Sequence, residues 1–284
     1  MVVLVTGANG QLGQSLQFIA QNYPEINFVF CSSSELDISN KENCEQVFLK
    51  HKPQYGINAA AYTAVDKAES EPEKAYLNNA IGAKNIAEVC KKHNTVLIHV
   101  STDFVFDGNK TTPYTEEDVP NPTGVYGQSK LEGEFEIKKT WEKHFIVRTS
   151  WVYSKFGNNF MKTMLRLASE RDSISVVNDQ IGTPTNAIDL AETLIKMIKV
   201  NNQLPRMDLY GIYNYSNEGQ CSWFEFAQEI FKINKDTINL LPITTSDYPT
   251  PAKRPKYSVL DKTKIKLIFK IEIKSWNQSL ISIF

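Results

Sequence analysis

The first part of the chain contains the feature that most restricts its fold. Residues 1–5 form a short apolar run, which is typical of a buried parallel strand, and residues 11–21 have the apolar spacing of a helix. Between them lies the glycine-rich segment GANGQLG, residues 7–13. A strand, a glycine turn and a helix N-terminus make an anion site, because free backbone N–H groups and the helix dipole point to one place. The segment predicts a dinucleotide phosphate loop.

The glycines of this loop follow the spacing G-x-x-G-x-x-G and not G-x-G-x-x-G. Glycine is needed where a Cβ atom would block the close approach of the backbone to a pyrophosphate. The observed spacing favours the type of loop found in short-chain dehydrogenases/reductases. An ordinary strand-to-helix turn is the alternative for this segment taken alone.

Strand and helix patterns alternate over the first half of the chain. We expect further strands at 28–31, 57–61, 95–100 and 145–148, and helices at 41–50, 75–92 and around Tyr126. Such repetition predicts an α/β fold, a Rossmann-like doubly wound parallel sheet with right-handed crossovers.

Beyond residue 150 the pattern is less regular, with helices expected at 158–170, 187–199 and 223–231. We interpret residues 1–150, with part of 172–200, as a dinucleotide-binding domain. Residues 151–284 then form mainly a smaller α/β substrate-binding lobe, and the chain passes between the lobes more than once.

Composition narrows the class of protein. The chain has 284 residues, a formal net charge of −1 and no long basic run, so neither nucleic acid nor a membrane surface is an expected partner. No stretch is long and apolar enough to span a membrane, and the N-terminal apolar run is too short for a signal peptide. Its four cysteines lie far apart without a C-x-x-C pair. We expect reduced, buried thiols in a cytoplasmic enzyme.

A second motif carries the chemistry. Tyr126 and Lys130 are four residues apart and share one face of a helix. A phenol has a pKa near 10, and a nearby ammonium lowers that pKa by stabilising phenolate. Thr102 follows the strand at 95–100, where open α/β sheets place ligands, and its hydroxyl can bond a carbonyl oxygen. With the phosphate loop, these residues predict reversible hydride transfer to a carbonyl; an exposed helical pair and a strand-end threonine are the alternative.

Several longer segments resemble one family. They are TGANGQLG from residue 6, NAAAYTAVDKAE from 58, STDFVFDG from 101, VYGQSKLEGE from 125, RTSWVYS from 148, NDQIGTPT from 178 and PTPAKRPKYSVLD from 249. The chain is similar in these segments to the dTDP-4-dehydrorhamnose reductase family of extended short-chain dehydrogenases/reductases. The resemblance implies NAD(P)H-dependent reduction of the C4 carbonyl of a dTDP-linked 4-keto-6-deoxy sugar, giving dTDP-L-rhamnose.

The resemblance also implies roles for individual residues. Catalysis is assigned to Thr102, Tyr126 and Lys130. Cofactor binding is assigned to the loop, the second strand end and the third strand end: Gly7, Gly10, Gln11, Leu12, Gly13, Asp37, Ile38, Ala61, Tyr62 and Thr63, with Tyr126 and Lys130. Substrate binding is assigned to Thr102, Asp103, Trp151 and, at the pyrophosphate, Arg254.

At two places the sequence differs from what the resemblance would imply: the positions of the metal ligands and the residues that select the coenzyme. Family members have been described with a divalent metal held by acidic side chains at a homodimer contact, but Ser15 and Ile188 stand at the matching positions. A bound Mg²⁺ is therefore not expected, although a homodimer is compatible with the resemblance. The second strand is followed by three serines and Glu35, neither a clear acid nor a clear base for the adenine ribose. This favours NADPH, with NADH also used.

Two other functions fit the same sequence. Reduction to the other C4 epimer would give dTDP-6-deoxy-L-talose, because the stereochemistry depends on how the sugar is oriented. A non-catalytic regulatory subunit is the alternative of another class, since the beta subunit of methionine adenosyltransferase resembles this family. The intact set of Thr102, Tyr126 and Lys130 argues against that alternative.

Overall fold

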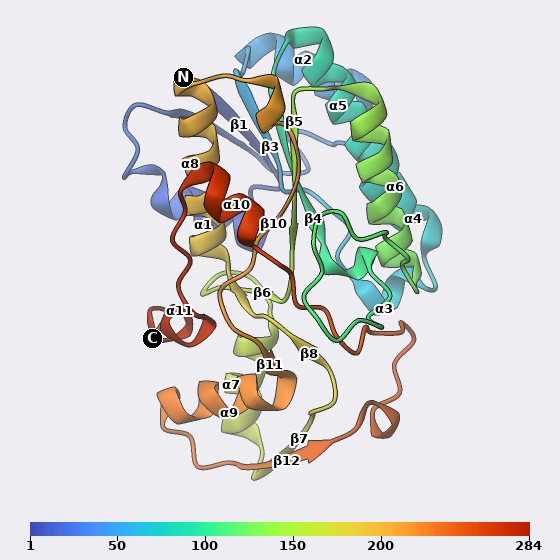
Figure 1. Cartoon of the computed structure of the whole chain (residues 1–284), viewed down its shortest axis with the longest axis vertical. Helices are drawn as coiled ribbons and strands as arrows, with labels where there is room; N and C mark the ends of the chain where they lie inside the picture. Colours follow the sequence, from blue (N-terminus) through green and yellow to red (C-terminus); the bar gives the residue numbers. More distant parts are fainter.

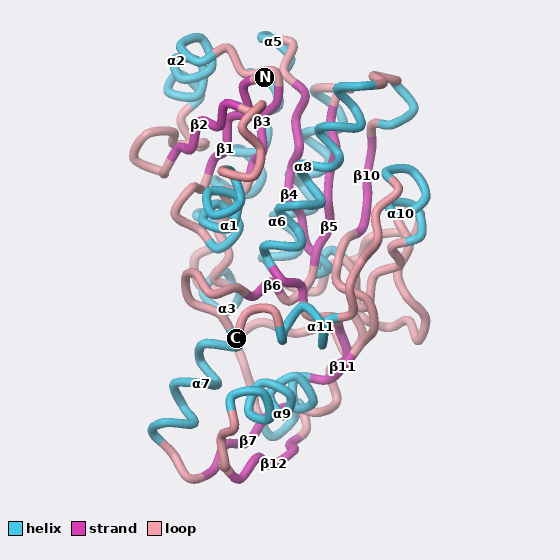
Figure 2. The backbone as a smooth tube through the Cα atoms, turned by 90° about the vertical axis from the view of Figure 1, so that its left-hand side faces the viewer, coloured by secondary structure: helices cyan, strands magenta, loops and turns pink.

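A six-stranded parallel sheet forms the larger part of the molecule. The computed structural model describes all residues from Met1 to Phe284. The strands lie in the order β10-β5-β4-β3-β1-β2, and every neighbouring pair is parallel (Figure 2). Their bounds are β1 Val2–Thr6, β2 Asn27–Cys31, β3 Tyr55–Asn58, β4 Val96–Thr102, β5 His144–Thr149 and β10 Gly211–Asn214.

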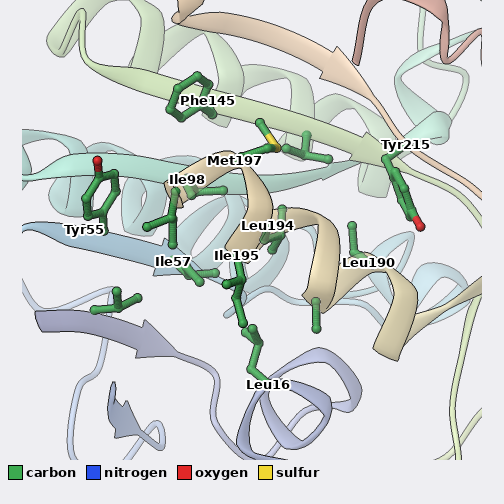
Figure 3. Packing of buried hydrophobic residues seen from close by; sticks show 14 of the residues in the cluster. Leu16, Tyr55, Ile57, Ile98, Phe145, Leu190, Leu194, Ile195, Met197 and Tyr215 are labelled. Atoms are coloured by element: carbon green, nitrogen blue, oxygen red, sulfur yellow. The ribbon is translucent and has the colours of Figure 1, made fainter. Parts of the chain in front are cut away.

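Helices cover both faces of this sheet. On one face lie α2 (Lys41–His51), α5 (Gly82–His93) and α6 (Val125–Thr140), and on the other lie α1 (Gln11–Ala20) and α8 (Ala187–Gln203), with α10 (Thr263–Phe269) beside them (Figure 1). The apolar strands supply both cores, because successive side chains point to opposite faces. Figure 3 shows Ile57 and Ile98 packed against Leu194 and Ile195 of α8. The predicted doubly wound parallel sheet is confirmed.

The helix expected at 75–92 is interrupted. The structure divides it into α4 (Pro72–Tyr76), a π-helical turn (Leu77–Ile81) and α5, and a short helix α3 (Val65–Ala68) precedes them. Asn79 in the π turn is buried, and its amide bonds both the N–H and the carbonyl of Tyr62 and the Ser129 hydroxyl. The wider turn therefore places one side chain where it ties the segment after β3 to α6.

A smaller lobe lies beyond the carboxyl ends of the strands. Its core of 12 buried residues is centred on α7 (Phe160–Glu170) and α9 (Trp223–Asn234), with the parallel pair β7 (Ser173–Val177) and β12 (Asn239–Ile243). The remaining elements are short: β6 Val152–Tyr153, β8 Ile181–Gly182, β9 Thr185–Asn186, β11 Cys221–Ser222, α11 Trp276–Ile281 and 3₁₀ turns at Asp103–Val105, Met207–Leu209 and Thr245–Asp247. The chain crosses between the lobes repeatedly, because α8 and β10 return to the large sheet.

No helix of the structure combines the length and the apolar character needed to cross a membrane. All four cysteines are buried and unpaired, as the sequence predicts.

Candidate active site

A cavity of about 630 Å³ lies at the carboxyl ends of β1, β3, β4 and β5, between the sheet and the smaller lobe. The strand order of the sheet reverses between β1 and β3, and the cavity lies at the carboxyl ends of these strands. Open α/β sheets bind their ligands at such a position. The cavity brings together eleven of the residues assigned to the site by the sequence: Gly10, Gln11, Leu12, Ala61, Thr63, Thr102, Asp103, Tyr126, Lys130, Trp151 and Arg254.

Glycine shapes the phosphate loop at two positions that do not line the cavity. Gly7 has a φ of +68°, and a Cβ added there would lie 2.8 Å from the backbone of Ala59 and Ala60. A Cβ on Gly13 would lie 2.3 Å from the Gly7 carbonyl oxygen. Gly7 lets the loop pack against the segment after β3, and Gly13 lets α1 pass close to the backbone of the loop itself. Helix α1 begins at Gln11, so its first N–H groups lie at the cavity.

Gln11 connects this loop to the smaller lobe. Its amide donates to the Val152 carbonyl at 3.3 Å and accepts from the Asn159 side chain at 3.0 Å. Asn159 also caps α7, where its side chain accepts from the Lys162 N–H. One side chain of the phosphate loop therefore contacts both the strand after Trp151 and the first helix of the lobe.

Tyr126 and Lys130 lie in the first turns of α6, and Thr102 is the last residue of β4. Lys130 is almost completely buried, donates to the Val100 carbonyl at 2.7 Å and has its Nζ 3.3 Å from His99 Nε2. Burial lowers the pKa of Lys130 to about 8, and the charge of Glu134 partly opposes this. The lysine can therefore change its protonation state near neutral pH.

The phenol of Tyr126 behaves differently from the sequence-based expectation. Burial raises the pKa of Tyr126 to about 12, the Thr102 side chain opposes this, and the charge of Asp103 adds to it. The Lys130 amine is directed at the Val100 carbonyl and at His99 and not at the phenol, so burial decides the direction of the shift. The predicted lowering of the Tyr126 pKa by Lys130 is not seen in this arrangement, and the phenol is held in its protonated form.

Asp103 is a buried carboxyl group beside Thr102. Its Oδ1 accepts from the Thr102 hydroxyl at 3.1 Å. Burial raises the pKa of Asp103 to about 6, although hydrogen bonds from Ser258 and Thr102 oppose the rise. The carboxyl therefore lies in the cavity wall with spare hydrogen-bonding capacity for a polar ligand.

Two stacked indoles form the wall of the cavity on the side of the smaller lobe. The rings of Trp151 and Trp223 are 3.5 Å apart between centroids, with 9° between their planes. Trp151 has a φ of +46°, a conformation that L-residues rarely adopt. A Cβ on Gly182 would lie 2.5 Å from the Trp151 ring, so the glycine makes room for the stack. A strained backbone and a tight fit together fix the direction of this side chain.

Arg254 reaches the cavity from the loop that follows β12. Its guanidinium bonds both oxygens of Asp66 in α3, at 3.0 and 2.7 Å, and also the Thr250 hydroxyl at 2.6 Å. The Ala252 N–H donates to the same carboxylate. This fork-to-fork pair attaches a loop of the later sequence to the segment after β3, and it presents a cation at the cavity.

Besides Gly7 and Gly13, three assigned residues lie outside the cavity. Asp37 accepts from the N–H and the hydroxyl of Ser39, and Ile38 belongs to the core beneath α2 and α5. Tyr62 turns its hydroxyl away to donate to Glu71 at 2.8 Å. Asp37 thus stabilises a turn, Ile38 packs in the core, and Tyr62 anchors its loop to Glu71.

Sequence reasoning missed several cavity residues and the pair beneath them. Trp223, Phe104, Val65 and Asn158 line the cavity without having been assigned to it, although Phe104 and Val65 stand in the family-like segments from residues 101 and 58. Behind the catalytic residues, Arg148 of β5 and Glu134 of α6 form a buried ion pair at 2.7 Å. Glu134 also accepts from Ser101, the residue before Thr102. Only the i, i+4 spacing of Lys130 and Glu134 could have suggested that this carboxylate lies near the site.

Comparisons with known proteins agree with this geometry. A family model described as the RmlD substrate binding domain matches residues 1–284. The chain is 44% identical to a dTDP-4-dehydrorhamnose reductase of Aggregatibacter actinomycetemcomitans, over 99% of this chain and 97% of that protein. A crystal structure of the same enzyme from Clostridium acetobutylicum is similar with a TM-score of 0.94, 41% identity and coverage of 100% and 98% of the two chains. A Bacillus anthracis dTDP-4-dehydrorhamnose reductase solved with NADP has a TM-score of 0.92 and 43% identity, with the same coverage.

Proposed function

This chain belongs to the dTDP-4-dehydrorhamnose reductase family, and from that premise we propose how its own residues carry out the reaction. It is an NADP-dependent oxidoreductase that reduces the C4 carbonyl of dTDP-4-dehydro-β-L-rhamnose to give dTDP-L-rhamnose. The relatives favour neither the 6-deoxy-L-talose epimer nor a regulatory subunit. The observation that carries the proposal is the convergence of Thr102, Tyr126 and Lys130 in a cavity that the phosphate loop also lines.

Proton transfer is assigned to Tyr126. When bound, the reduced nicotinamide supplies the hydride that C4 receives. The phenol, with a pKa of about 12, is protonated at neutral pH and can donate to the oxygen at C4. The Thr102 hydroxyl orients that oxygen from the strand side. Lys130 contributes positive charge, which favours the phenolate left after the transfer.

The sugar nucleotide is held mainly by residues of the smaller lobe and its connections. We assign the nucleotide part to the wall made by Trp151, the diphosphate to Arg254 and a sugar hydroxyl to Asp103. Asp66 binds one side of the guanidinium, and the Nε–H and the second Nη2–H of Arg254 have no partner in the structure, which leaves donors for an anionic oxygen. Binding energy from the nucleotide then positions the reacting carbonyl, which lies at a distance from it. In this division the sheet with residues 1–150 and part of 172–200 holds the coenzyme, and the later residues mainly hold the substrate.

Coenzyme choice depends on the residues after β2. The Glu35 carboxylate accepts from the N–H and the hydroxyl of Ser32, at 2.8 and 2.7 Å. It is therefore bound within its own turn and less available to a ribose hydroxyl, while serine hydroxyls can bond a 2′-phosphate. We expect NADPH to be preferred and NADH to be used as well. The ratio of kcat/KM values for the two coenzymes, measured at equal pH, tests this.

The two positions at which the resemblance would place metal-binding acidic side chains, at a subunit contact, are occupied by Ser15 and Ile188. The Ser15 hydroxyl donates to the Gln11 carbonyl, and Ile188 offers no ligand atom. We propose a cytoplasmic enzyme, compatible with a homodimer, that needs no bridging Mg²⁺. Unchanged activity and sedimentation in EDTA would support this, and loss of either on chelation would contradict it.

The function itself is tested with the purified chain. NADPH oxidation should depend on dTDP-4-dehydro-β-L-rhamnose, and NMR of the product should show the rhamnose configuration at C4. A product with the talose configuration would replace the assignment with the other epimer. Failure to oxidise NADPH, by a folded protein that binds the coenzyme, would contradict the enzymatic role.

A further inference from the structure

Three buried polar residues form a row across the middle of the sheet. Thr6 of β1 is the register partner of Asn58 in β3, and Asn58 is the partner of His99 in β4. Each is about 1% exposed. The preceding row is wholly apolar and consists of Val5, Ile57 and Ile98. Polar groups are costly at such depth unless they are bonded, so this row calls for an explanation beyond packing.

Hydrogen bonds join the row into one series that ends at the catalytic lysine. The Thr6 hydroxyl donates to Asn58 Oδ1 at 2.6 Å, and the Asn58 amide donates to His99 Nδ1 at 3.0 Å. His99 Nε2 then lies 3.3 Å from Lys130 Nζ. The Ala60 N–H donates to the Thr6 hydroxyl oxygen at the other end. The series therefore runs from the backbone beside the phosphate loop to Lys130.

The order of donors decides which ring nitrogen carries the hydrogen. Asn58 Oδ1 is occupied by the Thr6 hydroxyl, so only its NH₂ group faces the imidazole, and Nδ1 has to accept. Burial and the charge of Lys130 keep the pKa of His99 well below its usual value, so the ring is neutral. A neutral imidazole that accepts at Nδ1 carries its hydrogen on Nε2, which faces Lys130.

Lys130 has no acid to balance its charge. It forms no ion pair, because Glu134, one turn further along α6, is bound by Arg148 and Ser101. Around Lys130, the other charged or titratable groups on α6 and on the elements that pack against it here are Tyr126 and Glu134 on α6, Asp103 after β4, and Arg148 and His144 on β5. Its polar contacts are therefore the Val100 carbonyl and His99 alone.

We propose that His99 is a positioning residue for Lys130, and that the row Thr6–Asn58–His99 directs an N–H group at the lysine, so that the lysine releases its proton more readily than it would beside an accepting nitrogen. The inference rests on the proposed catalytic role of Lys130. The sheet itself would then set how readily the lysine holds its proton, through residues that touch neither substrate nor coenzyme.

The test reverses the direction of the row. In Asn58→Asp a carboxylate accepts from both Thr6 and His99, so the ring hydrogen moves to Nδ1 and Nε2 becomes an acceptor for the ammonium. The alkaline limb of the pH profile of kcat should move to higher pH by about one unit. Thr6→Val frees Asn58 Oδ1 to turn towards the ring, and should move the limb in the same direction by about half a unit.

A matched control and a reference variant make the result decisive. Thr95→Val removes another fully buried threonine hydroxyl, which donates to the Pro53 carbonyl at 2.7 Å and does not contact the row; it should leave the limb in place. If Asn58→Asp or Thr6→Val folds and the alkaline limb of its kcat profile lies at the same pH as in the wild type, the inference is overturned. If Asn58→Asp fails to fold, the isosteric Thr6→Val decides. Lys130→Met distinguishes failure of this inference from failure of the proposed function. If Lys130→Met loses turnover but the alkaline limb of the row variants does not move, only the role of the row is refuted. If Lys130→Met keeps full turnover, the catalytic role of the lysine is refuted as well.

Discussion

The two sides of the cavity are built in different ways. On the sheet side, Thr102 and Lys130 belong to a seven-residue strand and a 16-residue helix, and buried hydrogen bonds hold them from below. On the side of the smaller lobe, Trp151 directly precedes a two-residue strand and Arg254 lies in a loop. Stacking and a partly exposed ion pair hold these two residues. The reacting groups are therefore fixed by regular structure, and the recognition groups by individual side-chain contacts.

This difference predicts that turnover and substrate binding can be changed separately. The largest effect should come from Tyr126→Phe, which removes the proton donor but keeps the ring against Phe104. Turnover should fall by about two to four orders of magnitude, while coenzyme affinity stays close to that of the wild type. Steady-state kinetics and NADPH titration measure the two quantities. Near-wild-type turnover would show that the donor is another group.

A second change tests how strongly the sheet side is held. Glu134→Gln leaves the buried Arg148 without its counter-charge and weakens the contact to Ser101. Breaking a buried pair in this way should lower the free energy of unfolding by about 3 kcal/mol. Chemical denaturation measures it, and Glu170→Gln, in an exposed pair with Arg166, is the control that should change stability little. Equal effects of the two variants would remove the contrast between buried and exposed support.

Trp151→Ala tests the other side of the cavity. Loss of an aromatic wall should cost about 2 kcal/mol of substrate binding, or about 30-fold in kcat/KM for the dTDP-linked sugar. NADPH affinity should barely change, because the phosphate loop is joined to this segment through the Val152 carbonyl, which the substitution leaves in place. Trp223→Ala removes the stacking partner and should have a smaller effect in the same direction. Full activity of a folded Trp151→Ala protein would make this indole a core residue only.

The smallest effect is expected at the ion pair between the loop and α3. Asp66→Asn keeps the shape but weakens the hold on Arg254, so KM for the sugar nucleotide should rise by about threefold with kcat unchanged. Arg254 lowers the pKa of Asp66, so the pair persists at neutral pH and is lost only as pH falls through that lowered value. The KM of the wild type should therefore rise at acid pH, and that of Asp66→Asn should not follow it. Parallel KM profiles would exclude this role of the pair.

Sequence patterns predicted the sheet side better than the side of the smaller lobe. Apolar runs located β1, β4 and β5, and the spacing of Tyr126 and Lys130 placed both on one helix, because these signals are local. Strand β10 is only four residues long and joins the sheet through partners more than 60 residues earlier, so its sequence alone does not indicate it. His99 lies in the apolar run at 95–100, which predicts a buried strand but no role for this histidine. Its role depends on cross-strand register, which no local pattern contains.

The return of α8 and β10 to the large sheet has a consequence for how the protein is made. Six of the 23 residues in the core beneath α8 come from that helix, and they are Leu190, Ala191, Leu194, Ile195, Met197 and Ile198. A nascent chain that has emerged only as far as β5 would carry the whole phosphate loop and the catalytic helix, yet one face of its sheet would still be uncovered. Coenzyme binding during synthesis should therefore begin late, after part of the smaller lobe has left the ribosome. The order of segments along the chain thus makes the two lobes interdependent in folding, although they are distinct in chemistry.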